Sequence, residues 1–140
     1  MYKRQAYWYN GAIVSSEISR GLDIVELTPS SFLTQNEIDA AKTVRWDYLN
    51  AQGQPKIVWP ASFALARAYA DQLERSNGLT GARLSSLRQA LTSAERASGA
   101  ARRTALTQLA TQVNGYAAGS SDAAKVRMLA GAVRDLAAAR

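Results

Sequence analysis

The chain has 140 residues, of which 47% are hydrophobic and 20% are charged, a balance typical of one or two small folded domains. It contains no cysteine and no histidine, which excludes disulfides, thiol nucleophiles, Ser-His-Asp triads and zinc sites built on either residue. The net charge of +6 is uneven, because residues 75–140 carry ten basic and only three acidic side chains. No apolar run approaches the roughly 20 residues needed to cross a bilayer.

The first five residues, Met-Tyr-Lys-Arg-Gln, resemble the in-frame translation of a transposase adaptor used to prepare sequencing libraries. We interpret residues 1–5 as an adaptor scar and the remainder as the C-terminal piece of a longer protein, a metagenomic fragment. In the alternative interpretation Met1 is the natural start and begins a short basic arm.

Residues 6–29 are predicted to form three antiparallel strands. Asn10-Gly11 separates two strand-like runs and readily takes the two positive φ angles of a type I′ turn. A second turn at 19–21 leads to a β-branched run that ends at Thr28-Pro29. A meander of this size has two unpaired edges and little core, so we expect it to be poorly stable without further strands.

Residues 30–60 are expected to be a connector containing one short helix. Thr34 and Glu37 have the spacing of a capping box, which predicts a helix over 35–42. Large aromatic residues are frequent in the first half of the chain, and we interpret four of them as a seam that packs the strands, the connector and the first long helix together. This aromatic seam comprises Trp8, Trp46, Trp59 and Phe63. The alternative is that the aromatic residues form a stacking platform for sugars or bases.

Residues 61–140 show the apolar spacing of amphipathic helices four times over. We predict helices at about 61–77, 81–97, 100–117 and 121–139, with Thr80 or Ser121 as N-caps and an early end or kink at Gly115. Because the loops are short, consecutive helices should be antiparallel neighbours. The predicted fold class is therefore α+β, an antiparallel β-meander followed by an up-down helical bundle.

The strand-forming region also carries a family resemblance. Residues 21–29, Gly-Leu-Asp-Ile-Val-Glu-Leu-Thr-Pro, resemble the repeat of the LVIVD family, although Asp23 replaces valine and Glu26 replaces aspartate in its five-residue core. The preceding residues resemble the closing blade of such proteins. The motif residues are Glu17, Arg20, Gly21, Leu22, Asp23, Ile24, Val25 and Glu26.

This resemblance implies that residues 6–29 are the last blade of an exported β-propeller, located outside the cell, in the periplasm or on the cell surface. The helical region is similar to the FIMAH-type tails of exported bacterial proteins. The implied partners are the rest of the propeller and a protein or cell-surface ligand, without a membrane span and without nucleic acid.

We identify no catalytic, cofactor-binding or metal-binding residues, because each carboxylate pair has a structural explanation. Asp71 and Glu74, for example, are expected to pair along their own helix with Arg67 and Arg75. The predicted function is non-enzymatic binding or surface attachment. Two alternatives remain: a scaffold for a propeller enzyme whose active site lies in a missing N-terminal region, and a small basic helical protein that binds an anionic partner.

Overall fold

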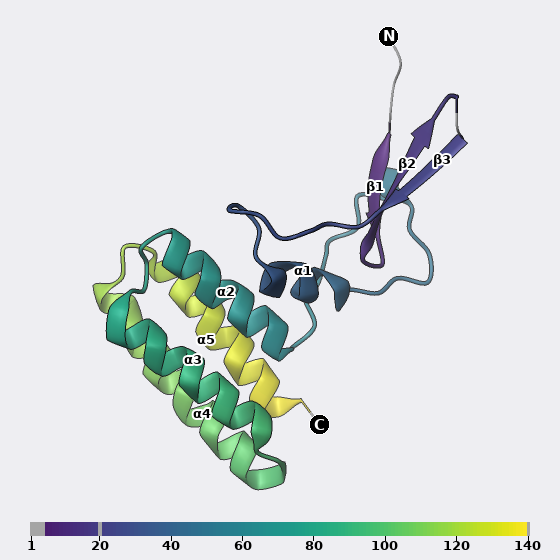
Figure 1. Ribbon diagram of the computed structural model, residues 1–140. Coiled ribbons are helices and arrows are strands. Elements are labelled where there is room, and N and C mark those ends of the chain that lie inside the picture. Colours follow the sequence, from purple (N-terminus) through teal and green to yellow (C-terminus); the bar gives the residue numbers. More distant parts are fainter. Residues whose placement is uncertain (1–4, 20, 140) are drawn as a thin grey trace. The chain divides into compact units, whose positions relative to one another are not determined.

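The computed structural model describes residues 5–19 and 21–139 and has an α+β fold, with a three-stranded sheet followed by five α-helices (Figure 1). The chain divides between Pro60 and Ala61 into two compact units, at the boundary that the sequence predicts. Residues 1–4, which carry most of the suggested adaptor scar, lie outside the described residues.

The first unit begins with strands β1 (Ala6–Tyr9), β2 (Ala12–Glu17) and β3 (Gly21–Val25), which pair antiparallel in the order β1-β2-β3. Asn10 and Gly11 have φ angles of 52° and 97°, which are the two left-handed positions that the predicted hairpin turn requires. The predicted meander is therefore confirmed, and β1 and β2 pair residue by residue from the hairpin turn onward.

The register places apolar side chains on both faces of the sheet. Tyr7 pairs with Val14, which pairs with Ile24, and these three residues share one face. The next row, Trp8, Ile13 and Val25, points to the opposite face. A sheet with apolar rows on two faces must be covered on both sides to remove them from water.

The connector contains helix α1 (Gln35–Lys42), which has the predicted bounds. Both halves of the predicted capping box are present: the Glu37 amide donates to Thr34 Oγ1 at 3.2 Å, and the Thr34 amide donates to Glu37 Oε2 at 2.8 Å. At the other end of α1, Lys42 Nζ pairs with Glu26 Oε2 at 3.1 Å and links the helix to the residue after β3. A 3₁₀ turn, η1 (Ala51–Gly53), follows.

The second unit is an antiparallel bundle of α2 (Phe63–Arg75), α3 (Gly81–Arg96), α4 (Gly99–Gly115) and α5 (Ala123–Ala138). As predicted, the third bundle helix ends at Gly115, and the 3₁₀ turn η2 (Tyr116–Gly119) follows it. The predicted apolar stripes form the core. Its largest fully buried side chains are Leu73, Leu87, Leu91, Leu106, Val113, Val126, Leu129 and Val133.

Two details of the bundle differ from the sequence-based prediction at the helix starts. Thr80 occupies the N-cap position of α3, but its side chain makes no capping hydrogen bond. Helix α5 is capped by Asp122, whose carboxylate accepts from the Lys125 amide at 3.1 Å. Ser121, the predicted cap, instead donates through its hydroxyl to the Asn77 carbonyl at 3.2 Å, because it lies against the turn between α2 and α3.

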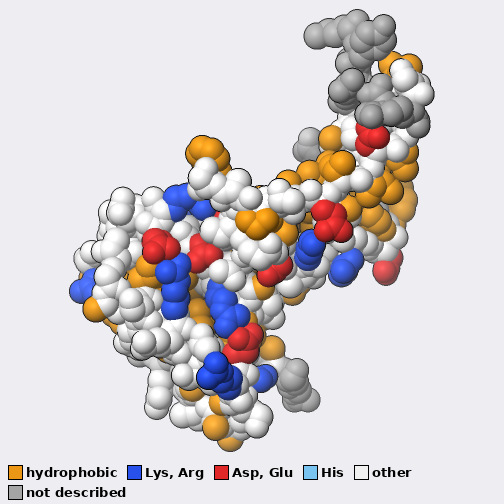
Figure 2. Space-filling view, viewed as in Figure 1, with side chains coloured by type: hydrophobic (Ala, Val, Ile, Leu, Met, Phe, Trp, Pro, Cys, Tyr) orange, Lys and Arg blue, Asp and Glu red, His pale blue; other side chains and the backbone are white. Residues whose placement is uncertain are grey.

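Arg88 of α3, which the sequence-based prediction did not include, is a partner of both acidic residues of α2, whereas the predicted pairing with Arg75 stays a prediction. Arg88 of α3 donates to Asp71 at 2.6 Å and to Glu74 at 2.7 Å, and Arg67 of α2 pairs with Glu95 of α3. These ion pairs join neighbouring helices of the bundle. Basic and acidic side chains accordingly lie next to one another on the helical unit in Figure 2.

Candidate functional site

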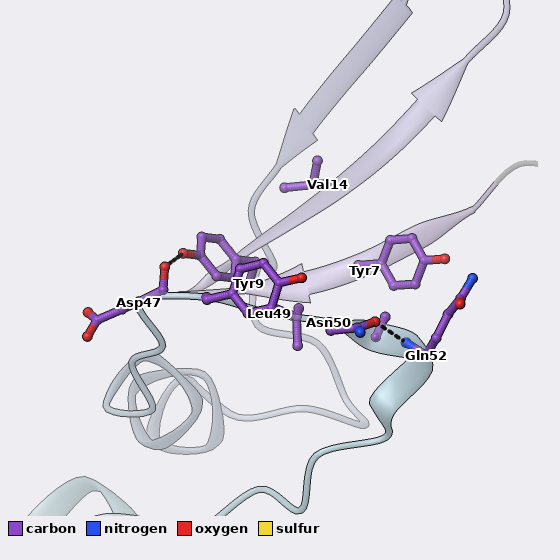
Figure 3. A pocket seen from close by; sticks show the side chains of 9 residues that line it. Tyr7, Tyr9, Val14, Asp47, Leu49, Asn50 and Gln52 are labelled. Atoms are coloured by element: carbon purple, nitrogen blue, oxygen red, sulfur yellow. Dashed lines mark hydrogen bonds between the residues drawn. The ribbon is translucent and has the colours of Figure 1, made fainter.

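The first unit contains an open pocket of about 550 Å³ that we call the tyrosine pocket (Figure 3). Three aromatic rings contribute to it, together with polar side chains from the connector and a few small apolar groups. The lining residues are Tyr7, Tyr9, Val14, Asp47, Tyr48, Leu49, Asn50, Ala51 and Gln52.

Strand geometry supplies one side of the pocket. Tyr7 and Tyr9 are two residues apart on β1 and therefore share a face of the sheet. Val14 of β2 lies directly opposite Tyr7 and adds an apolar patch between the rings. Residues 47–52 of the connector provide the other side, as Figure 3 shows.

Hydrogen bonds from the hairpin turn hold the connector in place. The side chain of Asn10 forms a reciprocal pair with the backbone of Trp46: Nδ2 donates to the carbonyl at 2.9 Å, and the Trp46 amide donates to Oδ1 at 2.8 Å. Tyr9 Oη donates to the carbonyls of Trp46 and Asp47 at 2.9 and 3.3 Å. Arg45 Nη1 donates to the Asn10 carbonyl at 3.0 Å. We call this set of contacts the Asn10 clamp, and it fixes the edge of the pocket.

The exposed rings and amides of the pocket can take part in binding. The Tyr48 side chain is 81% exposed and that of Tyr7 is 41% exposed. Asn50 Oδ1 accepts from the Gln52 amide at 3.1 Å and caps η1, whereas Asn50 Nδ2 has no partner among the described residues. The described part of the chain contains no group of three or more acidic side chains that could hold a metal ion.

The aromatic seam proposed from the sequence stays a prediction, because its members belong to two separate units. Trp8 lies on the sheet face opposite Tyr7, and Trp46 serves the clamp through its backbone. Trp59 is 44% exposed. Phe63 lies at the edge of the helical core, with the guanidinium groups of Arg67 and Arg102 at 5.9 and 5.8 Å from its ring centre.

The residues that resemble the LVIVD motif form β3 and its end. Gly21 has a φ of 90°, a conformation that favours glycine, and Leu22 to Val25 complete the strand. Glu26 follows the strand and pairs with Lys42. Arg20 and the side chain of Glu17 lie outside the described residues, so the predicted ion pair of Arg20 stays a prediction.

Sequence reasoning did not find the tyrosine pocket as a unit. It noted the aromatic residues, but the connector side chains Asn50 and Gln52 were not identified. The signal available in the sequence was Asn10. The hairpin turn requires the backbone conformation of this residue but gives no role to its side chain. Residues 10 and 46 are brought together only by the fold.

No helix in the described part of the chain is long and apolar enough to cross a membrane. Comparison of the chain with family models finds no match, and neither the curated proteins nor the solved structures include a significant match to it.

Proposed function

We propose that this protein is a non-enzymatic binding protein whose sheet is one blade of an exported, LVIVD-type β-propeller. The observation that carries the proposal is the sheet with apolar rows on both faces. A propeller stacks its blades radially, so each blade is covered on two sides and only short edges remain. The rest of the propeller would be the first partner, and a protein or cell-surface ligand the second.

The exposed fractions support a need for neighbours. Ile24 and Leu22 are 65% and 59% exposed on one face, and Val25 is 51% exposed on the other. Residues 47–52 cover only the β1 end of the sheet face that carries Leu22 and Ile24. At roughly 25 cal/mol per Å² of apolar area, leaving several such side chains in water gives up several kcal/mol that a neighbouring blade would recover.

Hydrogen exchange on the full chain tests this proposal. We expect the amides of β1, β2 and β3 to exchange about 100-fold faster than the core amides of the bundle helices, since a small sheet without neighbours is only marginally stable. Equal protection in sheet and bundle would contradict the proposal. Sequencing the source DNA upstream of the Met1 codon, from an adaptor-free library, should reveal further Gly-Leu-x-Ile-Val-like repeats in frame.

A second candidate function, binding of an anionic partner, is favoured by the charge distribution on α4 and α5. Helix α4 contains no acidic residue. Arg103, Arg127 and Arg134 form no ion pair with any described residue, in contrast to Arg67 and Arg88. Arg127 and Arg134 are two helical turns apart on one face of α5. Arg103 of α4 and Leu136 of α5 both line a small cleft, and Leu136 lies in the turn of α5 that follows Arg134.

Salt dependence tests the second candidate. Binding of a short DNA duplex, or of vesicles containing acidic lipid, should weaken steeply as salt rises from about 50 to about 200 mM, because bound counterions are released. In the duplex assay Arg127→Ala should lower the salt slope by about one, whereas Arg67→Ala, which removes a paired arginine, should lower it less. Absence of binding to both probes at low salt would eliminate this candidate.

A further inference from the structure

We infer that the tyrosine pocket binds a pyranose ring of a neutral oligosaccharide. The inference deepens the proposed binding function and rests on it only for the assumption that binding is the role of the protein. It depends on three features of the pocket: exposed aromatic faces, amide groups beside them, and a set of described lining residues that includes no cationic side chain.

The aromatic faces match one side of a sugar. A pyranose ring presents C–H groups on its faces and hydroxyls around its rim, and the negative face of an aromatic ring attracts the slightly positive C–H hydrogens. Tyr48 and Tyr7 offer such surfaces at 81% and 41% exposure. Because a tyrosine ring is rigid, little conformational entropy is lost when a ligand stacks on it.

The polar side chains match the hydroxyl rim. Asn50 Nδ2 can donate to a hydroxyl, because it has no partner among the described residues, while Asn50 Oδ1 accepts from the Gln52 amide. The side-chain amide of Gln52 adds a donor and an acceptor on the connector side of the pocket, beside Asn50 (Figure 3). A few placed polar groups around an apolar surface are the usual composition of a small-molecule site.

The charges select a neutral ligand. Among the described residues, the pocket lining contains one acidic residue, Asp47, and no lysine or arginine, and Arg45 nearby donates to the Asn10 carbonyl. A phosphate or a uronic acid would find no compensating cation among the described residues that line the pocket. Nucleotides and acidic sugars are therefore disfavoured, although their rings could stack on tyrosine.

The pocket stays available within the proposed propeller. Residues 47–52 already occupy the space beside Tyr7, Tyr9 and Val14, so a neighbouring blade cannot lie flat on that part of the face. Leu22 and Ile24 at the β3 end remain free for such a blade. Where the sheet is folded, the Asn10 clamp ties the connector side of the pocket to the strand side.

Amide chemical-shift titration of the full chain tests the inference. The probes are cellohexaose, chitohexaose and mannohexaose, each at up to about 10 mM, which detects a Kd near 1 mM. We expect at least one of them to shift the amides of residues 7–9 and 47–52 in a saturable way. Tyr48→Ala should weaken that binding about tenfold, the effect of losing one stacking ring. Phe32→Ala is the matched control, because this ring is 83% exposed in the same unit but does not line the pocket.

Absence of saturable shifts with all three oligosaccharides would overturn the inference, and so would shifts that Tyr48→Ala leaves unchanged. Both readouts are separate from the hydrogen-exchange test of the propeller proposal. Sugar binding by a highly protected sheet would retain the pocket and reject the blade. A fast-exchanging sheet that binds no sugar would retain the blade and reject the ligand.

Discussion

Asn10 combines a backbone role with a side-chain role that a turn position does not require. Its φ of 52° serves the hairpin, and asparagine tolerates that conformation better than most residues. Its side chain bonds both backbone groups of Trp46. One residue therefore sets the strand connection and positions the connector that forms the edge of the tyrosine pocket.

Asn10→Gly separates the two roles. Glycine keeps the positive φ but removes both hydrogen bonds to Trp46, each worth about 0.5–1.5 kcal/mol. We expect the Trp46 amide to exchange faster, while the pairing of β1 with β2 is retained. Asn10→Asp preserves the acceptor and loses the donor, so the Trp46 amide should exchange at an intermediate rate in this variant. Unchanged exchange at Trp46 in Asn10→Gly would show that the clamp does not hold the connector.

The pairing of Glu95 with Arg67 makes part of the bundle's stability depend on pH. Hydrogen bonding from Arg67 lowers the pKa of Glu95 below its ordinary value. A lowered folded-state pKa contributes stability above the unfolded pKa of about 4.3, and this contribution is lost as pH falls through the folded pKa. Because the Glu95 side chain is 44% exposed, solvent screening keeps the contribution small.

A double-mutant cycle with Arg67→Gln and Glu95→Gln measures this pair. We expect a coupling energy below about 1 kcal/mol at pH 7, from urea unfolding of the four proteins. The coupling should decline below about pH 4 and vanish once Glu95 is protonated in the folded state. A coupling that persists undiminished in acid would mean that the ion pair is not its source.

At the scale of elements, locally encoded features were predictable from the sequence. The Asn10-Gly11 turn and the Thr34–Glu37 capping box act within four residues, and both have the predicted geometry. The apolar stripes of the bundle are equally local, because helical periodicity alone places them on one face.

Features that depend on tertiary packing were not predictable. Glu95 lies 28 residues from Arg67, so spacing along one helix could not identify the pair. The tyrosine pocket depends in the same way on contacts that span more than thirty residues. Ser121 was assigned as a cap from its residue type, but the fold directs its hydroxyl to Asn77 and leaves the cap to Asp122.

The turn between α2 and α3 leaves no room for a side chain at Gly78. A Cβ there would lie 2.7 Å from Leu73 Cδ2 and 3.1 Å from Asp122 Cβ. Since Leu73 is fully buried, it cannot move away freely. The Ser120 hydroxyl also donates to the Gly78 carbonyl at 2.7 Å. This hydrogen bond joins the turn between α2 and α3 to the connection that precedes α5.

Gly78→Ala should destabilise the bundle by about 1–3 kcal/mol, the usual cost of overpacking a filled site. Gly131→Ala is the matched control, because its Cβ would meet nothing within 4 Å inside α5. Alanine is the better helix former there, and we expect a gain of up to about 1 kcal/mol. Urea unfolding followed by circular dichroism measures both changes, and equal effects of the two substitutions would contradict the packing argument.

At the scale of the whole molecule, burial is divided unevenly between the two units. The helical core is a single cluster built only from residues of the bundle. The described residues of the sheet form no comparable cluster, and large apolar side chains such as Ile24 and Val25 remain more than half exposed. The stability of each unit should follow the apolar surface that it buries.

Two truncated chains test this difference. Residues 61–140 alone should remain helical and unfold cooperatively, since α2 to α5 supply their own core. Residues 6–59 alone should show weak strand signal and a broad, non-cooperative melt, because a three-stranded sheet with two open faces cannot offset its conformational entropy. Thermal unfolding followed by circular dichroism distinguishes the two. A sharp transition in 6–59 would show that the sheet needs no neighbours and would remove the physical basis for treating it as a propeller blade.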